Sequence, residues 1–164
     1  DTPTCTICEE FDPVITEIRP GNFIFYDLMQ HFIGSCDIAD IASAIQCPII
    51  AKYPERQMLV VYGGAIHLSC SHGFHQSLLD GTDKIFGLVV KSHPDGTWEF
   101  KGYDTYVNKV SQEHGEISAP KKFIDTVEIG DVLTILPYHS CITANLFTTI
   151  YTTSGKKWLS FRYD

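Results

Sequence analysis

Short apolar runs rich in Val, Ile, Phe, Tyr and Thr recur along the chain, with turn-forming residues between them. Runs of this length and composition are typical of β-strands rather than of helices. The sequence therefore predicts strands over residues 23–26, 48–52, 58–62, 85–91, 97–102, 132–136 and 148–152.

Two turn signals join neighbouring runs into predicted hairpins. A His-Pro-Asp-Gly stretch at residues 93–96 separates two strand-like runs, so we expect residues 85–102 to form one hairpin. Ser154 and Gly155 separate the runs at 148–153 and 157–162 in the same way.

Helical periodicity is weak. Residues 37–44 carry apolar side chains at helical spacing and predict two turns, and residues 141–147 predict a short helix after Ser140. The predicted fold class is mainly β, with a barrel or a pair of packed sheets.

The composition excludes several classes of partner. A chain of 164 residues with 44% hydrophobic residues can bury a core, and a net charge of −8 disfavours nucleic acid and anionic membranes as partners. No apolar run approaches the roughly 20 residues that span a bilayer. No secretory leader is visible, so we expect a cytoplasmic protein whose six cysteines are reduced. Because the chain opens without methionine, we interpret it as cut from a longer protein or numbered from an internal point.

The best local candidate for a metal site is the pair His139 and Cys141, which follows the predicted strand at 132–136. In an extended segment, residues two apart point to the same side, so an imidazole and a thiolate can bind one ion. Zinc suits this donor pair, and two protein ligands leave open positions for catalysis. The alternative is a pair packed at a strand end without metal.

Two further groups have the chemistry of a binding site. Glu113, His114 and Gly115 combine a carboxylate, an imidazole and a flexible residue, which suits proton transfer or the orientation of a metal ligand. Arg19 and Gly21 precede a predicted strand, where a guanidinium and an exposed amide suit an anion or a ring nitrogen. A plain surface turn is the alternative for each group.

Three weaker signals have simpler interpretations. Cys5 and Cys8 have zinc-ribbon spacing but no second pair, so we expect two small buried residues. We expect a solvated loop for His72 and His75. The glycines at 63–64 indicate a close approach of the backbone to a ligand or a neighbour.

Taken in order, five segments resemble the D-threonine aldolase and D-serine dehydratase group of pyridoxal-phosphate enzymes. They are TPT at 2–4, TEIRPGNF at 16–23 running into FYD at 25–27, YGG at 62–64 with HLS at 67–69, SQEHG at 111–115, and PYHSCITA at 137–144. Such enzymes have an alanine racemase-type architecture, an N-terminal (β/α)8 barrel followed by a β domain. The resemblance implies that residues 1–30 end the barrel and that residues 31–164 form the C-terminal β-barrel-like domain.

The resemblance also assigns roles to individual residues. His139 and Cys141 match the metal pair of the group, and Glu113 and His114 are implied to orient the metal ligands or the substrate. The implied contacts to pyridoxal phosphate are Thr2, Arg19, Gly21 and Asn22.

The cofactor's Schiff-base lysine lies near the start of the barrel in this group, and this chain has no lysine before Lys52. We therefore expect the rest of the barrel, with that lysine, to lie outside this chain.

The implied function is that of the metal-binding portion of a zinc- and pyridoxal-phosphate-dependent lyase for D-3-hydroxy amino acids. The lyase would be an aldolase or a dehydratase, would work as a homodimer, and would be inactive without the barrel. The main alternative is a non-catalytic β-rich oligomerisation or binding domain. A self-contained zinc hydrolase with His114 as a third ligand is a further alternative.

Overall fold

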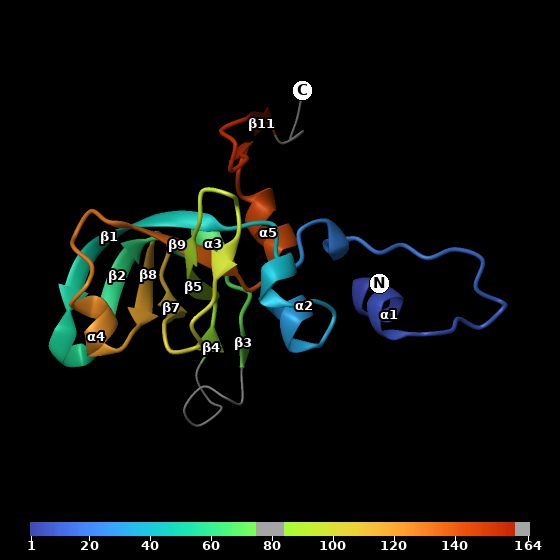
Figure 1. The fold of residues 1–164 in the computed structure, drawn as a ribbon, viewed down its shortest axis with the longest axis horizontal. Coiled ribbons are helices and arrows are strands. Elements are labelled where there is room, and N and C mark those ends of the chain that lie inside the picture. The colour runs from blue at the N-terminus through green and yellow to red at the C-terminus, as the bar shows by residue number, and fades with distance from the viewer. Residues whose placement is uncertain (75–83, 160–164) are drawn as a thin grey trace.

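The computed structural model describes residues 1–74 and 84–159, and its central feature is a closed antiparallel barrel (Figure 1). Neighbouring strands follow the order β5-β7-β8-β2-β1-β9, and β9 pairs back with β5, which closes the ring. The barrel strands are β1 (Ile45–Tyr53), β2 (Met58–Tyr62), β5 (Gly87–Ser92), β7 (Tyr106–Val110), β8 (His114–Ser118) and β9 (Val132–Pro137).

Shorter elements surround this barrel. The remaining strands are β3 (Gly73–Phe74) with β4 (Lys84–Ile85), β6 (Trp98–Glu99) beside β5, and β10 (Thr149–Tyr151) with β11 (Lys157–Leu159). The helices are α1 (Thr2–Ile7), η1 (Asn22–Ile24), α2 (Leu28–Phe32), η2 (Ile38–Asp40), η3 (Pro54–Arg56), α3 (Ala65–Leu68), α4 (Lys121–Ile124) and α5 (Ser140–Asn145). In Figure 1, α4 lies at one end of the barrel, and α2 and α5 lie at the other end, towards the N-terminal arm.

The barrel interior is filled by alternate residues of its strands. In β2, Leu59 and Val61 are fully buried while the residues between them are more exposed, as the two-residue period of a strand requires. Ile117 of β8 and Ile135 of β9 are likewise fully buried in the same cluster. Burial of each such side chain contributes roughly 1.5–3 kcal/mol.

A second apolar cluster joins the N-terminal segment to the outer side of the barrel. Leu28 and Ile41 pack with Leu88 and Leu136 from β5 and β9. The indole nitrogen of Trp98 donates a hydrogen bond to the carbonyl of Ile41 at 2.6 Å, which ties the β5–β6 hairpin to this segment. The N-terminal segment is thereby fixed beside the end of β9.

Most of the predicted strands and turns are confirmed. β2 has the predicted bounds, and the β5–β6 hairpin turns at Gly96, whose φ is +87°. The second hairpin is present as β10 and β11, with φ +81° at Gly155. The last part of its predicted second run, residues 160–162, lies outside the described residues.

Other predictions are wrong. Residues 23–26 are no strand, because the carbonyl of Asn22 accepts hydrogen bonds from the amides of Phe25 and Tyr26 and turns the chain. Residues 37–44 form only the short helix η2. Strands β7 and β8 were not predicted, because their outward positions carry polar residues such as Lys109 and Glu116. Cys5 is partly exposed and Cys8 is exposed, so the expected burial of this pair is also wrong.

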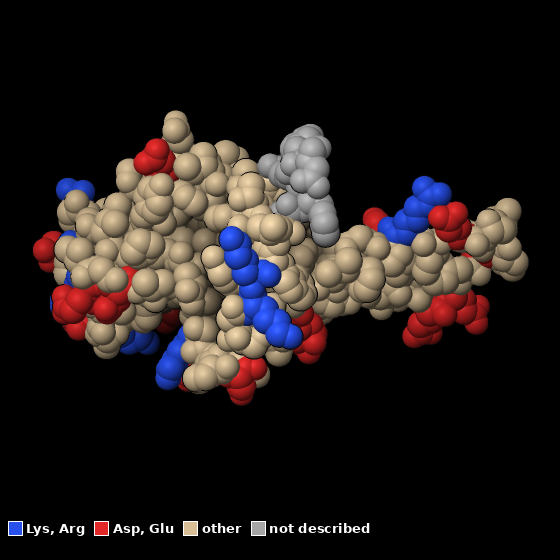
Figure 2. Space-filling model, turned by 90° about the horizontal axis from the view of Figure 1, so that it is seen from above, with Lys and Arg blue, Asp and Glu red and all other residues tan. Residues whose placement is uncertain are grey.

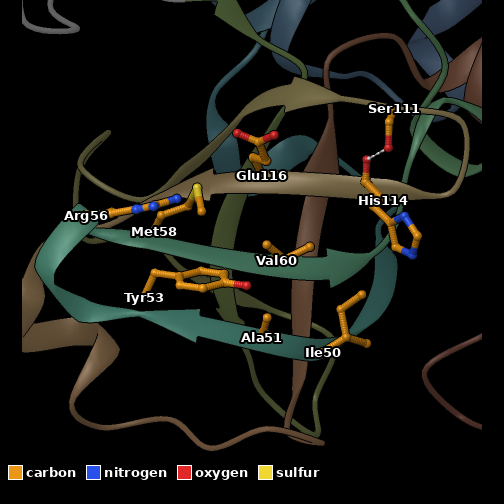
Figure 3. A pocket seen from close by; sticks show the side chains of 9 residues that line it. All are labelled: Ile50, Ala51, Tyr53, Arg56, Met58, Val60, Ser111, His114 and Glu116. Atoms are coloured by element: carbon orange, nitrogen blue, oxygen red, sulfur yellow. Dashed lines mark hydrogen bonds between the residues drawn. The ribbon is translucent and has the colours of Figure 1, made fainter.

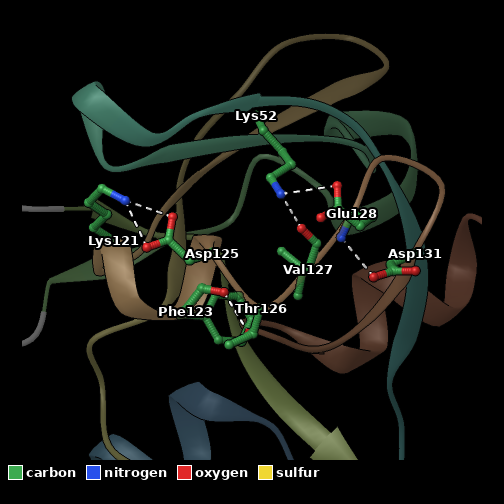
Figure 4. Close-up of polar contacts among 8 residues, drawn as sticks. All are labelled: Lys52, Lys121, Phe123, Asp125, Thr126, Val127, Glu128 and Asp131. Carbon is green, nitrogen blue, oxygen red and sulfur yellow. Dashed lines mark hydrogen bonds and ion pairs between the residues drawn. The ribbon is translucent and has the colours of Figure 1, made fainter.

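The loop after α4 is attached to β1 by one lysine. The ammonium of Lys52 donates to the carbonyl of Val127 and forms an ion pair with Glu128 at 3.3 Å (Figure 4). The backbone amide of Glu128 in turn donates to the carboxylate of Asp131 at 2.8 Å. These contacts hold the loop against the barrel at the end opposite α5.

Acidic and basic side chains are scattered over the face shown in Figure 2, and much of that face is uncharged. The basic side chains do not form a single patch on this face, and the chain as a whole has a net charge of −8. None of the helices in the described ranges combines the length and apolar character that a membrane-spanning helix requires.

Candidate functional site

The residues predicted to bind metal lie where β9 passes into α5. β9 ends at Pro137, and His139 is the residue preceding the helix, with φ −133° and ψ 96°. Cys141 lies in the first turn of α5 and is exposed, whereas His139 is partly buried. The expected single extended segment is therefore wrong: the chain bends into a helix between the two donors, so a strand's side-chain alternation does not describe them.

A buried polar network surrounds the residue between the two donors. The amide of Ser140 donates to the carboxylate of Asp27 at 2.8 Å, and the Ser140 hydroxyl donates to the side-chain oxygen of Asn22 at 2.8 Å. The Asn22 side-chain amide donates to the same Asp27 carboxylate oxygen at 2.6 Å. All three residues are buried, so each of these groups is satisfied within the protein rather than by solvent.

The carboxylate of Asp27 also begins α2. Its other oxygen accepts the amide of Gln30 at 2.9 Å, which is the usual N-cap hydrogen bond. Burial, and secondarily the charge of Asp27, raises the pKa of Tyr138. Burial raises the pKa of Cys36 to about 11, with further contributions from the charges of Asp40 and Asp27. Asp27 thus influences the pKa values of two side chains near the proposed metal ligands, Tyr138 and Cys36.

The predicted cofactor contacts fall into two kinds. The hydroxyl of Thr2 accepts the backbone amide of Asn22 at 3.0 Å, so both residues belong to the buried network just described. Arg19 has a side chain that is 83% exposed and pairs with Glu17 at 2.6 Å. Gly21 is exposed, with no atom within 4 Å of an added Cβ. The structure therefore joins Thr2 and Asn22 to the metal segment and leaves Arg19 and Gly21 on the surface of the N-terminal arm.

Glu113 lies in the turn between β7 and β8, His114 is the first residue of β8, and both are exposed. The carbonyl of Glu113 accepts the amide of Gly63 at 2.9 Å. A Cβ on Gly64 would lie 2.5 Å from the carbonyl carbon of Glu113 and from the amide nitrogen of His114. The close approach predicted for the two glycines is confirmed, and the partner is this turn.

The helix α3 separates that turn from the metal candidates. His67 on α3 stacks edge-on against Tyr62 at 4.8 Å between ring centroids, and burial lowers its pKa while the charge of Glu113 opposes the shift. The hydroxyl of Thr143 on α5 donates to the carbonyl of Leu68 at 3.1 Å. Glu113 and His114 are thus connected to α5 through α3 and share no hydrogen bond with His139 or Cys141 in the described part of the chain.

An open depression lies on the outer face of the barrel beside His114 (Figure 3). It has a volume of about 450 Å³ and an apolar floor formed by side chains such as Val60 and Ala51. His114 lies at one end and Arg56 at the other, and the hydroxyl of Ser111 donates to the His114 carbonyl at 3.2 Å. His114 therefore faces this depression on the sheet.

The donors at positions 139 and 141 match the chemistry of zinc, which accepts imidazole nitrogen and thiolate sulfur. Over residues 1–74 and 84–159, no group of three or more His, Cys, Asp or Glu side chains is placed to hold a metal ion. The pair can therefore supply two ligands, and the other coordination positions would be filled from outside the described residues. His72 is partly buried against Phe86 at 4.9 Å, and His75 lies outside those residues.

Sequence reasoning missed the roles of Asp27 and Ser140. Both stood inside segments that carried the family resemblance, but no spacing rule connects them because they lie 113 residues apart. An aspartate immediately before a helix is an N-cap signal, and it was the one available sign of Asp27's importance.

Comparison with known families gives a direct match. The family model described as "Putative serine dehydratase domain" matches residues 42–153, which is more than half of the chain. The D-serine dehydratase of Dictyostelium discoideum is 31% identical over 156 residues, which cover 90% of this chain and 36% of that protein. The chain thus spans about a third of the length of this relative.

Solved structures share the fold. An alanine racemase-like protein from Idiomarina loihiensis superposes with a TM-score of 0.75 at 28% identity, covering 95% of this chain and 40% of that one. D-threo-3-hydroxyaspartate dehydratase, an enzyme known from Delftia sp. HT23, superposes with a TM-score of 0.77 at 25% identity, covering 96% and 42%. That structure is a metal-free variant in which a cysteine is replaced by alanine, and another variant replaces the histidine two positions earlier.

Proposed function

The chain belongs to the serine dehydratase domain family, and from this we propose that it supplies the metal-binding part of a zinc- and pyridoxal-phosphate-dependent dehydratase for D-3-hydroxy amino acids. The fold is the β-barrel domain of alanine racemase-like proteins, and the similar proteins include dehydratases that act on D-amino acids. The proposed zinc ligands are His139 and Cys141.

One observation carries the proposal. An imidazole and a thiol, two positions apart, flank a residue that is clamped by a buried carboxylate at the end of a barrel strand. The spacing equals that of the histidine and cysteine replaced in D-threo-3-hydroxyaspartate dehydratase, whose cysteine variant was solved in a metal-free form. A side-chain pair held in this way is suited to binding an ion in a fixed position.

Zinc held by His139 and Cys141 would supply a Lewis acid for an oxygen of the substrate. Two protein ligands leave coordination positions for the substrate and for a donor from outside the described residues. The part of this chain is to bind and orient the ion. Glu113 and His114 lie beyond α3. In this proposal they are not zinc ligands, and they affect the site only through the packing of α3 against α5.

In this proposal the chain supplies only part of the pyridoxal-phosphate site. Thr2 and Asn22 are committed to internal hydrogen bonds, and Lys52 is committed to Val127 and Glu128. Arg19 and Gly21 lie on the exposed arm, where they can contact a cofactor held elsewhere. We therefore propose that the Schiff-base lysine comes from a barrel outside this chain, and that this chain alone shows no dehydratase activity.

The partner in this proposal is that barrel, in an enzyme that works as a homodimer on small D-amino acids. The N-terminal arm supports such a partner, because it carries exposed apolar side chains that a separate domain would bury. They are Ile7, Phe11, Val14, Ile15, Ile18, Phe23 and Ile24.

The test is zinc content after dialysis, measured by mass spectrometry of the metal. We expect about one zinc per chain in the unmodified protein and less than about a tenth of that in His139→Ala and Cys141→Ala. His93→Ala and Cys8→Ser serve as matched controls, because His93 lies beside Glu99 of the β5–β6 hairpin and Cys8 is an exposed cysteine at the end of α1. The controls should retain their zinc.

Absence of stoichiometric zinc, or full zinc in His139→Ala, would contradict the proposal and favour a non-catalytic β domain. Activity is then measured as release of ammonia from D-serine by the chain combined with its barrel. Ammonia release that is unaffected by His139→Ala would separate the dehydratase from any role of this metal pair.

A further inference from the structure

Ser140 is the one residue between the two proposed zinc ligands, and a buried carboxylate accepts its backbone amide. Its acceptor is Asp27, whose exposed fraction is 0%, at 2.8 Å. The two residues are 113 positions apart, so the contact is created by packing the N-terminal segment against the start of α5. The hydrogen bond sits at the bend where the extended chain at His139 becomes helix.

The donors around Asp27 use both oxygens of its carboxyl group. One of its oxygens accepts from the amide of Gln30, and the other accepts from Ser140 and from the side-chain amide of Asn22. An asparagine would keep one accepting oxygen and present an N–H donor where the second oxygen lies. Among the described residues Asp27 takes part in no ion pair, so these hydrogen bonds are its compensation for burial.

Capping of α2 does not by itself explain this choice. Asparagine and serine cap helices about as well as aspartate, and the cap uses only the oxygen that faces Gln30. The second oxygen is directed at Ser140 and Asn22 instead. The second oxygen therefore stabilises the start of α5 and not α2.

Helix α5, which follows His139 and contains Cys141, depends on hydrogen bonds from outside the helix. Helix α5 has six residues, which is too short to be stable by its own hydrogen bonds. Its first turn is held from outside by the Asp27 carboxylate and by the side chain of Asn22, which accepts the Ser140 hydroxyl. Loss of that support would free the bend and, with it, the relative positions of His139 and Cys141.

We infer that Asp27 is a positioning residue for the metal site, which fixes the bend between His139 and Cys141 by accepting the amide of Ser140. This inference rests on the proposed function in one respect, that the two flanking residues bind the metal. Asn22 is the bridge that holds the Asp27 oxygen and the Ser140 hydroxyl in register.

The test is Asp27→Asn in the full chain, with Co²⁺ as a spectroscopic replacement for zinc. We expect Co²⁺ affinity to fall by about 10–100-fold, as for other residues that orient metal ligands, and the sulfur-to-cobalt charge-transfer band to shift or weaken. Asp37→Asn is the matched control, because Asp37 is an exposed aspartate that precedes the short helix η2. The control should bind Co²⁺ like the unmodified protein.

A second readout needs no metal. Hydrogen exchange of the Ser140 amide should be at least about tenfold faster in Asp27→Asn and unchanged in Asp37→Asn, because only the first leaves a single side-chain oxygen for the amides of Gln30 and Ser140. If Asp27→Asn does not fold, Asp27→Ser replaces it, since a serine hydroxyl can cap α2 but removes the oxygen that holds Ser140.

The outcomes separate the two claims. If the unmodified chain binds no Co²⁺, or if His139→Ala binds it normally, the proposed function fails and the assignment of Asp27 to a metal site fails with it. If the unmodified chain binds Co²⁺ through His139 and Cys141 but Asp27→Asn matches it in affinity, spectrum and Ser140 exchange, the inference alone is overturned.

Discussion

Gly64 lies where the end of β2 meets the turn between β7 and β8, and the contact leaves no room for a side chain. An added Cβ would lie 2.5 Å from the Glu113 carbonyl carbon, 2.5 Å from the His114 nitrogen and 2.6 Å from the Ser111 oxygen. All three are backbone atoms, so no flexible side chain can move aside. Gly64→Ala must therefore separate the two backbones.

The expected cost follows from what this separation breaks. Three hydrogen bonds cross the contact: Gly63 amide to Glu113 carbonyl at 2.9 Å, Ala65 amide to Ser111 carbonyl at 2.8 Å, and Ile66 amide to Gln112 carbonyl at 3.1 Å. Each contributes about 0.5–1.5 kcal/mol. Because φ at Gly64 is −96°, an ordinary value for alanine, crowding is the cause of the loss. We expect the free energy of unfolding to fall by about 2–4 kcal/mol.

Urea unfolding followed by tryptophan fluorescence measures this change as a lower midpoint at unchanged slope. Gly21→Ala is the control, because no atom lies within 4 Å of its added Cβ. We expect the control to be neutral or slightly stabilising, since alanine lowers the entropy of the unfolded chain. A Gly64→Ala midpoint within error of the unmodified protein would refute the steric argument.

Two further predictions concern titratable groups in the barrel and at α3. Burial raises the pKa of Cys47 to about 12, so we expect its thiol to react with a disulfide reagent only after unfolding. The exposed Cys70 should react in the folded chain, and fast labelling of both thiols would contradict this prediction. The pKa of His67 is lowered in the folded state, so the unfolded chain binds this proton more tightly. The free energy of unfolding should therefore fall as pH drops below about 6.5. The urea midpoint of His67→Gln should depend less on pH than that of the unmodified protein, and equal pH dependence of the two midpoints would contradict this prediction.

The sequence predicted some strands of the barrel correctly and missed others. Strand β2 was predicted with its bounds because the alternation of apolar and polar residues is a local signal. Strands β7 and β8 were missed because polar residues such as Lys109 and Glu116 interrupt that signal at positions that face away from the interior. In these strands, pairing with neighbours decides the structure more than their own composition does.

The site shows the same division. The identity and spacing of His139 and Cys141 are visible in the sequence, and together with the family resemblance they predicted a metal pair. The bend between them was not predicted, because the hydrogen bond of Ser140 to Asp27 forms between segments 113 residues apart. Glu113 and His114 were expected near the chemistry, yet the structure places them against the Gly63–Gly64 turn, beyond α3.

Local sequence signals were enough to predict the mainly β character and the turns at Gly96 and Gly155, because each depends on residues close together in the chain. The segments that resemble the family could also be read directly from the sequence. The tertiary structure alone decided the closure of the barrel by β5 and β9 and the buried contact of Asp27 with Ser140. Both arise when distant segments satisfy each other's hydrogen-bonding groups inside the protein, and no local pattern specifies which partner a buried donor will find.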